Sequence, residues 1–340
     1  MRKLATVQKI KEIVPIEGAD AIELAIVNGW KVVVAKNVGH KSGDSVVYCE
    51  IDSFLPIKEE FEFLRKTSYK KMSDGSEGFR LKTIKLRGQV SQGLIIPIDV
   101  LLKYGMSSDD VYEGLDVSDI LGIIKYEPPV PAELAGKVKG NFPSFIPKTD
   151  EERIQNLTKE FEEWKKSDVD FYVSEKLDGS SATYYYKDGV FGVCSRNLEL
   201  LETEGNTFWK VARDLDLENK MKSLGYNVSF QGELVGEGIQ GNPYRIKGHK
   251  VFFFNVFNID KHEYADLIEF VNTIHGLSLE AVPKIETKFK LPDTIEDLLN
   301  YSDSKSYHNP NFDREGVVIR SLDRKISFKV ISNKFLLKEK

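Results

Sequence analysis

The sequence predicts an α+β protein in which a small OB-like β-barrel precedes a larger domain of antiparallel strands and helices. Short strand patterns separated by turn residues fill roughly the first hundred residues. A proline-rich stretch follows, and beyond it strand patterns alternate with helix patterns. We therefore expect the barrel in residues 1–120, a connector in residues 121–148 and the second domain in residues 149–340.

The composition describes a soluble protein of two domains. Of the 340 residues, 41% are hydrophobic and 30% are charged, and this length suits two domains. The two cysteines, Cys49 and Cys194, are too few for a disulfide framework or a zinc site, so we expect an intracellular protein, cytoplasmic or nuclear. No apolar run is long enough to span a bilayer, and we expect no membrane association. The net charge of −5 still allows a local basic patch that binds nucleic acid.

The amino-terminal region contains several segments with the alternation and turn boundaries of short strands. They are residues 21–27, 30–36, 45–51, 79–86 and 93–98. Asn28-Gly29 separates the first two segments and is a two-residue hairpin signal. Strands of this length and spacing favour an OB-type barrel, and another small barrel is the alternative.

The segment at 79–86 begins a basic stretch that contains no acidic residue. Its cations are Arg80, Lys82, Lys85 and Arg87, and Phe79 lies beside them. A basic and partly aromatic strand face is how small barrels bind nucleic-acid strands, so these four residues are candidates for nucleic-acid binding. A solvated edge strand protected by its lysines is an equally good interpretation.

The second domain is predicted to begin with a helix. Thr149-Asp150-Glu151-Glu152 has capping-box spacing, which predicts a helix from there to about residue 166. Strands are expected at 171–176, 182–187, 190–195, 227–235, 251–259, 317–320 and 325–330. Helices are expected at 206–224 and 264–274.

The first of these strands ends in a lysine next to a turn, in the sequence Glu175-Lys176-Leu177-Asp178-Gly179. An Asp-Gly pair tolerates left-handed backbone, so we expect the chain to turn sharply here. The strand thus fixes an amine at the point where a loop opens. Alone, this pattern also fits a hairpin turn with solvated charges. It resembles the nucleophile motif of the covalent nucleotidyltransferases, which comprise RNA ligases, DNA ligases and messenger RNA capping enzymes.

Further stretches resemble the later motifs of that superfamily, in the same order. They are Ser195-Arg196-Asn197, Gln231-Gly232-Glu233 with the tail Gly238-Ile239-Gln240, Phe252-Phe253-Phe254-Asn255, Glu315-Gly316-Val317-Val318-Ile319-Arg320 and Ser327-Phe328-Lys329. Each stretch alone fits an ordinary core strand or a surface charge. Their common order across about half of the chain makes independent coincidence a poor explanation.

The resemblance implies a role for each matching residue. Lys176 would be the nucleophile that becomes AMP-lysine, and Lys329 a second catalytic cation. The ATP-binding residues would be Glu175, Lys176, Arg196, Glu233, Phe254, Glu315 and Lys329. Glu233, Glu315 and Asp178 would bind a divalent metal, because carboxylate oxygens suit Mg²⁺ or Mn²⁺. A free lysine has a pKa of about 10.4, so the metal and Lys329 are candidates for the cations that lower it.

The order of the domains distinguishes among the relatives. DNA ligases and capping enzymes usually carry their OB domain after the catalytic domain, whereas here the barrel comes first. This order resembles the Deinococcus-type RNA ligases (RNA ligase family 5). That resemblance implies an ATP-dependent, monomeric RNA repair enzyme that transfers AMP to an RNA or DNA 5′-phosphate. It would then join this end to an RNA 3′-hydroxyl at a nick in a duplex. An RNA-end guanylyltransferase and a non-catalytic nucleic-acid-binding relative are the alternatives.

Two residues depart from the family pattern. Many RNA ligases have asparagine where this chain has Ser181, and lysine where it has Ile331. Lys334 is the nearest candidate for the missing cation, because Ser332-Asn333 offers a turn that could bring it to the face of Lys329. The alternative is that Lys334 is a solvated surface charge.

Overall fold

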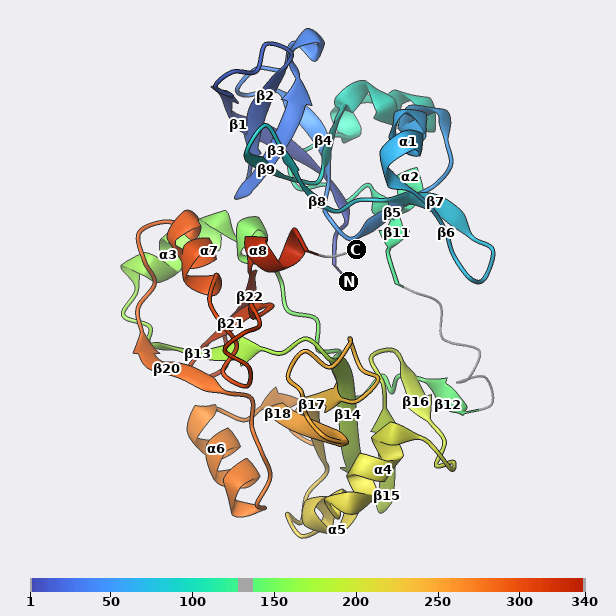
Figure 1. Cartoon of the computed structure of the whole chain (residues 1–340), viewed down its shortest axis with the longest axis vertical. Helices are drawn as coiled ribbons and strands as arrows, with labels where there is room; N and C mark the ends of the chain where they lie inside the picture. The colour runs from blue at the N-terminus through green and yellow to red at the C-terminus, as the bar shows by residue number, and fades with distance from the viewer. Residues whose placement is uncertain (1, 128–136, 339–340) are drawn as a thin grey trace. The chain divides into compact units, whose positions relative to one another are not determined.

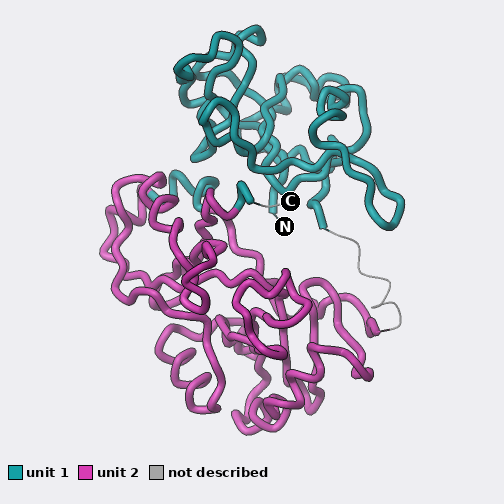
Figure 2. The backbone as a smooth tube through the Cα atoms, viewed as in Figure 1, with its two compact units in different colours: residues 1–130, 154–161, 336–340 teal, residues 131–153, 162–335 magenta. Residues whose placement is uncertain are grey.

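The chain divides into two units, which are described separately below. Unit 1 contains residues 1–130, 154–161 and 336–340, and unit 2 contains residues 131–153 and 162–335 (Figure 2). The computed structural model describes residues 2–127 and 137–338. Residues 128–136 of the predicted connector therefore lie outside the described residues.

Unit 1 is built mainly from antiparallel strands (Figure 1). One sheet has the order β10 (Leu94–Pro97), β4 (Ser45–Cys49), β1 (Ala5–Pro15), β2 (Ile22–Val27) and β3 (Trp30–Ala35). A second has the order β11 (Ile124–Lys125), β5 (Ser53–Leu55), β7 (Glu77–Arg80) and β6 (Tyr69–Lys71). The strands β8 (Thr83–Leu86) and β9 (Gln89–Gln92) form a separate hairpin.

The long strand β1 gives the first sheet its barrel-like course. Its first half pairs with β4 and its second half with β2, and the register shifts between Ile10 and Glu12. An irregularity of this kind bends a strand, so that one strand can continue through a curved sheet. The interior is filled by buried side chains that include Val47, Phe61 and Phe79.

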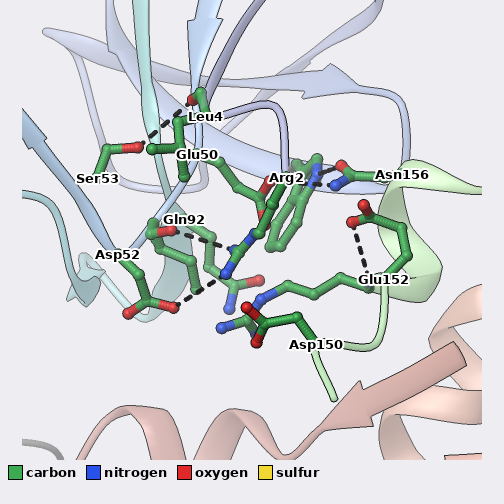
Figure 3. Close-up of polar contacts among 12 residues, drawn as sticks. Arg2, Leu4, Glu50, Asp52, Ser53, Gln92, Asp150, Glu152 and Asn156 are labelled. Atoms are coloured by element: carbon green, nitrogen blue, oxygen red, sulfur yellow. Dashed lines mark hydrogen bonds and ion pairs between the residues drawn. The ribbon is translucent and has the colours of Figure 1, made fainter. Parts of the chain in front are cut away.

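Residues 154–161 belong to unit 1, whereas the sequence grouped them with the second domain. The backbone N–H of Gly29 donates to the carbonyl of Gln155 at 2.9 Å. Asn156 accepts a hydrogen bond from the indole of Trp30 at 2.6 Å and donates one to Glu50 at 3.1 Å. Figure 3 shows Asn156 beside Glu50, which also pairs with Arg2. These contacts between residues far apart in sequence decide the membership of the segment.

Unit 2 contains two antiparallel sheets. The larger has the order β12 (Val138–Asn141), β16 (Leu198–Leu200), β15 (Val190–Cys194), β14 (Ser180–Lys187), β17 (Val228–Gly236), β18 (His249–Asn258) and β19 (Glu263–Tyr264). The smaller has the order β20 (Lys284–Phe289), β13 (Phe171–Lys176), β21 (Gly316–Ser321) and β22 (Ser327–Ile331). The strand β12 lies within the predicted connector, and β20 was not predicted.

The helices of the chain are short. They are α1 (Arg65–Ser68), α2 (Ser118–Leu121), α3 (Thr158–Lys166), α4 (Thr207–Asp214), α5 (Leu217–Lys222), α6 (Leu267–Gly276), α7 (Ile295–Ser302) and α8 (Asn333–Leu336). Short 3₁₀ turns occur at Lys36–Val38, Glu59–Leu64, Ile98–Tyr104, Ser108–Asp110 and Ile154–Asn156. None of the helices in the described ranges has the length and apolar character needed to cross a bilayer.

In the part of unit 2 that the structure describes, three helices pack on one face of the larger sheet. In Figure 1, α4 and α5 lie beside β15 and β14, and α6 lies beside β18. They bury a core that contains Tyr184, Phe230 and Phe253. The opposite face carries polar side chains, among them Ser181 and Glu233, which are directly paired across β14 and β17. This second face contributes the functional site.

Some of the predicted strands and helices differ from those of the structure. The single strand predicted at 79–86 is two strands, because β7 ends at Arg80 and β8 begins at Thr83. The helix predicted at 206–224 is interrupted at Asp216, where φ is 52°. The helix predicted from Thr149 begins only at Thr158, since the side chains of residues 149–151 form tertiary contacts instead of capping a helix. Cys49 and Cys194 are free and buried.

Candidate active site

Lys176 is the last residue of β13 and shares a sheet face with Lys329. In the register of the smaller sheet, Ser174 pairs with Val318, and Val318 pairs with Lys329. Residues directly opposite each other lie on one face, and so do residues two apart in a strand. The pairing therefore places the predicted nucleophile and the second predicted cation on the same face.

Two glutamates surround the Lys176 amine. Nζ donates a hydrogen bond to Oε2 of Glu315 at 2.9 Å and lies 2.8 Å from Oε1 of the same carboxylate. Burial by itself lowers the pKa of Lys176, but the negative charges of Glu315, Glu233 and Asp178 outweigh that effect, and the pKa is raised above its ordinary value. The amine is accordingly held as an ammonium ion in the absence of other cations.

The turn after Lys176 depends on glycine for a reason other than the predicted one. The sequence predicted left-handed backbone at Asp178-Gly179, and neither residue has a positive φ. A Cβ at Gly179 would instead lie 2.5 Å from the carbonyl oxygen of Leu234 and 2.7 Å from Val235. Glycine is required here because β17 approaches the turn closely.

Residues of the loop after β17 hold the same turn. The hydroxyl of Tyr244 accepts a hydrogen bond from the backbone N–H of Asp178, and Gln240 donates to the carbonyl of Gly179 at 3.4 Å. Gln240 belongs to the Gly-Ile-Gln tail that resembles RNA ligases, so the structure gives that tail a contact with the lysine motif. Tyr244 is a further residue of the site that the sequence patterns did not indicate.

Glu233 and Glu315 carry oxygen ligands, and the charges of both raise the pKa of the Lys176 amine. The backbone N–H of Gly179 donates to Glu233 at 3.1 Å. Burial raises the pKa of Glu233 to about 8, and repulsion from Glu315 and Asp178 adds to this, against the attraction of Lys176. Within the described ranges, no group of three or more His, Cys, Asp and Glu side chains is arranged to hold a metal. The donor chemistry fits Mg²⁺ or Mn²⁺, and phosphate or water oxygens would complete the coordination.

Phe254 differs from its aromatic neighbours in exposure. Phe252 and Phe253 are buried, whereas Phe254 is half-buried. The register between β17 and β18 shifts at this point, so that Gly232 pairs with Phe253 and Gln231 with Asn255. Phe254 is the extra residue of this bulge, which turns its ring out of the regular pattern. The guanidinium of Arg320 lies 5.8 Å from the centre of the ring.

The segment 147–153, which we call the acidic strap, was not predicted as part of the site. It contacts the larger sheet first, since Gln231 donates to the carbonyl of Pro147 at 2.7 Å and Thr149 shares a hydrogen bond with Ser181 at 2.9 Å. It then contacts the smaller sheet, where Lys329 donates its backbone N–H to Glu152 at 2.8 Å. The strap thus links both sheets around the site.

The charged side chains of the strap reach two arginines. Asp150 pairs with Arg196, one of the predicted ATP-binding residues, which is exposed. Glu151 pairs with Arg320 at 3.1 Å. Arg153 forms an isolated backbone bridge with Lys329. The only sequence signal for these contacts was the acidic run after the prolines, and a capping box explained it equally well.

Glu175 does not lie with the other predicted residues. It pairs with Val317 across β21 and is buried on the side of the sheet opposite to Lys176. One of its oxygens accepts the backbone N–H of Tyr307 at 2.8 Å. Burial raises the pKa of Glu175, although hydrogen bonds from Ser306 and Tyr307 act in the other direction.

The positions that depart from the family pattern are also defined. Ser181 is bonded to Thr149 of the strap, and Ile331 is buried. Lys334 lies in α8, with its side chain 64% exposed and its amine 3.8 Å from Asp303. Because β22 ends at Ile331, Lys334 does not continue the strand that carries Lys329.

The predicted nucleic-acid-binding residues of unit 1 are not on one strand face. Arg80 is only 9% exposed, and its guanidinium lies 4.1 Å from the centre of the Tyr126 ring. Lys85 and Arg87 are exposed on the separate hairpin β8–β9. Lys82 lies in the short link between β7 and β8. The prediction of one basic strand face is therefore wrong. The strand ends at Arg80, so the four basic residues do not lie on a single strand.

Comparisons with known proteins match both parts of the chain. A family model described as an OB-fold domain matches residues 4–98, and a model described as RNA ligase matches residues 169–335. The solved structure "Naegleria gruberi RNA ligase with PPi" has a TM-score of 0.92 and 42% sequence identity, with 100% of this chain and 99% of that chain covered. A mutant of the same ligase with ATP and Mn has a TM-score of 0.91 and 41% identity over 99% of each chain. Another mutant, with AMP and Mn, has a TM-score of 0.91 and 42% identity over 99% of each chain. No curated protein matches the chain.

The matches to the family models and to the solved structures confirm the predicted order, an OB-fold domain before an α+β domain.

Proposed function

The chain belongs to the RNA ligase family, and we propose that it joins RNA ends at the expense of ATP through a covalent AMP-lysine formed at Lys176. The observation that carries this proposal is the contact of the Lys176 amine with Glu315, within reach of the charge of Glu233 and on the sheet face of Lys329. The Naegleria gruberi relatives bound to ATP or AMP and Mn support the choice of nucleotide and of a divalent metal.

The first step would be attack of the neutral Lys176 amine on the α-phosphorus of ATP. A nitrogen–phosphorus bond forms, the bond to pyrophosphate breaks, and the amine loses a proton. Lys329 would offset charge on the phosphates, and Phe254 would stack on the adenine. Bound at Glu233, Glu315 and Asp178, Mg²⁺ or Mn²⁺ would supply positive charge that lowers the pKa of Lys176 and stabilises the leaving group. Glu175 and Arg196 remain proposed ATP-binding residues.

The later steps return Lys176 to its free form. A 5′-phosphate oxygen displaces the lysine from the AMP phosphorus, and an RNA 3′-hydroxyl then displaces AMP to form the phosphoric-ester bond. The order of an OB-fold domain before the catalytic domain supports the Deinococcus-type branch. With that branch we propose a monomeric enzyme that repairs RNA at nicks in duplexes whose 3′-hydroxyl strand is RNA.

Incubation with labelled nucleoside triphosphates and a divalent metal tests the proposal. Labelled ATP should leave label on the denatured protein, and Lys176→Ala should abolish it. A preference for GTP would instead support an RNA-end guanylyltransferase. Absence of label with every nucleotide, from protein that is folded by its melting curve, would support a non-catalytic relative.

A further inference from the structure

Arg320 is a buried arginine that connects three parts of unit 2. Its side chain is 2% exposed, and it donates to the hydroxyl of Ser174 on the neighbouring strand at 3.1 Å. It donates to Glu151 of the acidic strap, also at 3.1 Å. Its guanidinium lies over the ring of Phe254 in the other sheet. A planar guanidinium with two bonded partners has little freedom to move, which makes it a rigid support for an aromatic ring.

A second arginine of the same hairpin holds the residue after Phe254. Arg324 donates to the side chain of Asn255, which in turn donates to Gln231 at 2.8 Å. Burial lowers the pKa of Arg324 to about 10, and the nearby positive charge of Arg320 contributes. The β-bulge at Phe254 and Asn255 is thus contacted by two arginines of the β21–β22 hairpin, the buried Arg320 and the half-buried Arg324.

Glu151 of the acidic strap is the carboxylate that pairs with Arg320. Its side chain is 18% exposed, so water screens the pair only in part. A buried charge that loses its partner is strongly unfavourable, and the arginine would then change its position to reach water. The orientation of Arg320 over Phe254 therefore depends on the acidic strap.

We infer that Glu151 and Arg320 are positioning residues for nucleotide binding, because the strap fixes Arg320 and Arg320 fixes the Phe254 ring on which the base stacks. This inference rests on the proposed function, in which Phe254 contacts the adenine. It assigns to the strap a larger role in the nucleotide step than in the final sealing step. The bond between Glu151 and Arg320 joins residues 169 positions apart, so no local pattern indicated it.

The test is a kinetic comparison of Glu151→Gln with the wild type. The KM for ATP in self-adenylylation should rise about tenfold, with a smaller change in kcat. A displaced Phe254 ring would bind the adenine of ATP less tightly in the ground state. Sealing of RNA that already carries a 5′-adenylate should be reduced less. Glu199→Gln is the matched control, since Glu199 is 13% exposed, pairs with Lys139 at 2.8 Å and lies on β16. It should leave the KM for ATP unchanged.

A double-mutant cycle with Phe254→Leu separates positioning from a general loss of stability. If Glu151 acts through the ring, Glu151→Gln should raise the KM in the wild-type background and have little further effect in Phe254→Leu. Equal effects of Glu151→Gln in both backgrounds, or an unchanged KM in an active enzyme, would overturn the inference. Either result leaves the AMP-lysine proposal intact, because that proposal fails only if Lys176 is not labelled.

Discussion

The Lys176 amine forms an ion pair with Glu315, donating a hydrogen bond to Oε2 at 2.9 Å and lying 2.8 Å from Oε1. A lysine in this state is a poor nucleophile, because the ion pair stabilises its protonated form. Burial lowers the pKa of Lys176, but the negative charges of the nearby carboxylates outweigh this effect and raise it. The carboxylates therefore keep Lys176 protonated and unreactive until another cation neutralises their charge.

Replacing Glu315 by glutamine should make Lys176 more reactive in the metal-free protein. The substitution removes the nearest negative charge, so the pKa of Lys176 falls, and each unit gives about ten times more neutral amine at a fixed pH. The measurement is the rate at which an amine-acylating reagent modifies Lys176, followed by mass spectrometry between about pH 7 and pH 9. The exposed Lys210 on α4 serves as the internal reference. A slower modification of Lys176 in the variant would contradict the prediction.

Glu233 should make the metal-free protein less stable as the pH rises. Burial raises its pKa in the folded protein to about 8, whereas an unfolded glutamate has a pKa of about 4.3. Between these values the folded state binds a proton that the unfolded state does not, so the free energy of unfolding decreases with rising pH. Glu233→Gln stays neutral and avoids this loss. Its Tm should match that of the wild type near about pH 4 and exceed it by several degrees near about pH 8. A Tm difference that does not change with pH would contradict the assignment.

Gly179→Ala should reduce self-adenylylation by about 100-fold, because the new Cβ pushes the turn away from β17 and moves Lys176. Gly189→Ala is the matched control, because Gly189 also follows an aspartate. Its φ is 81° and a Cβ there would meet open space, so alanine should cost about 1 kcal/mol of stability through the backbone alone. Labelling by ATP and the Tm are measured for both variants. Equal labelling of the two would show that the close approach to β17 is not needed.

Lys329 should matter for ATP chemistry and Lys334 should not. Lys329 shares the face of Lys176 and is 8% exposed, whereas Lys334 is exposed on α8 near Asp303. Lys329→Ala should slow self-adenylylation strongly, and Lys334→Ala should match the wild type with ATP and with RNA that carries a 5′-adenylate. A selective loss of self-adenylylation in Lys334→Ala would assign it the triphosphate role of the missing lysine.

Arg80 should support the stability of unit 1 and not RNA binding. Its contact with the Tyr126 ring is buried, and its loss should cost about 1–2 kcal/mol. A double substitution of the exposed Lys85 and Arg87 by alanine should leave the Tm unchanged and flatten the salt dependence of RNA binding by about 1.5 units of slope. RNA affinity measured over a series of salt concentrations tests both variants. A flattened slope in Arg80→Ala with an unchanged Tm would place Arg80 at the RNA.

The sequence by itself determined the local features of the site. An aromatic and β-branched strand that ends in Lys176, followed by Asp178-Gly179, is encoded within nine residues, and the structure has a strand and a turn at these positions. The alternation of a strand also implies that Glu175 and Lys176 face opposite ways, a consequence that motif matching overlooked. The order of the two domains followed from patterns that are equally local.

Only the tertiary structure decided which distant residues meet. The acidic run at 150–152 has the spacing of a helix cap, yet its side chains pair with the exposed Arg196 and the buried Arg320, and its backbone bonds to a neighbouring strand. Arg80 belongs to a basic stretch in sequence, yet the fold buries it against Tyr126. In each case the contacts formed in the folded protein outweigh a weak local preference worth about 1 kcal/mol. Such contacts depend on how the strands pair and pack, which no short stretch of sequence specifies.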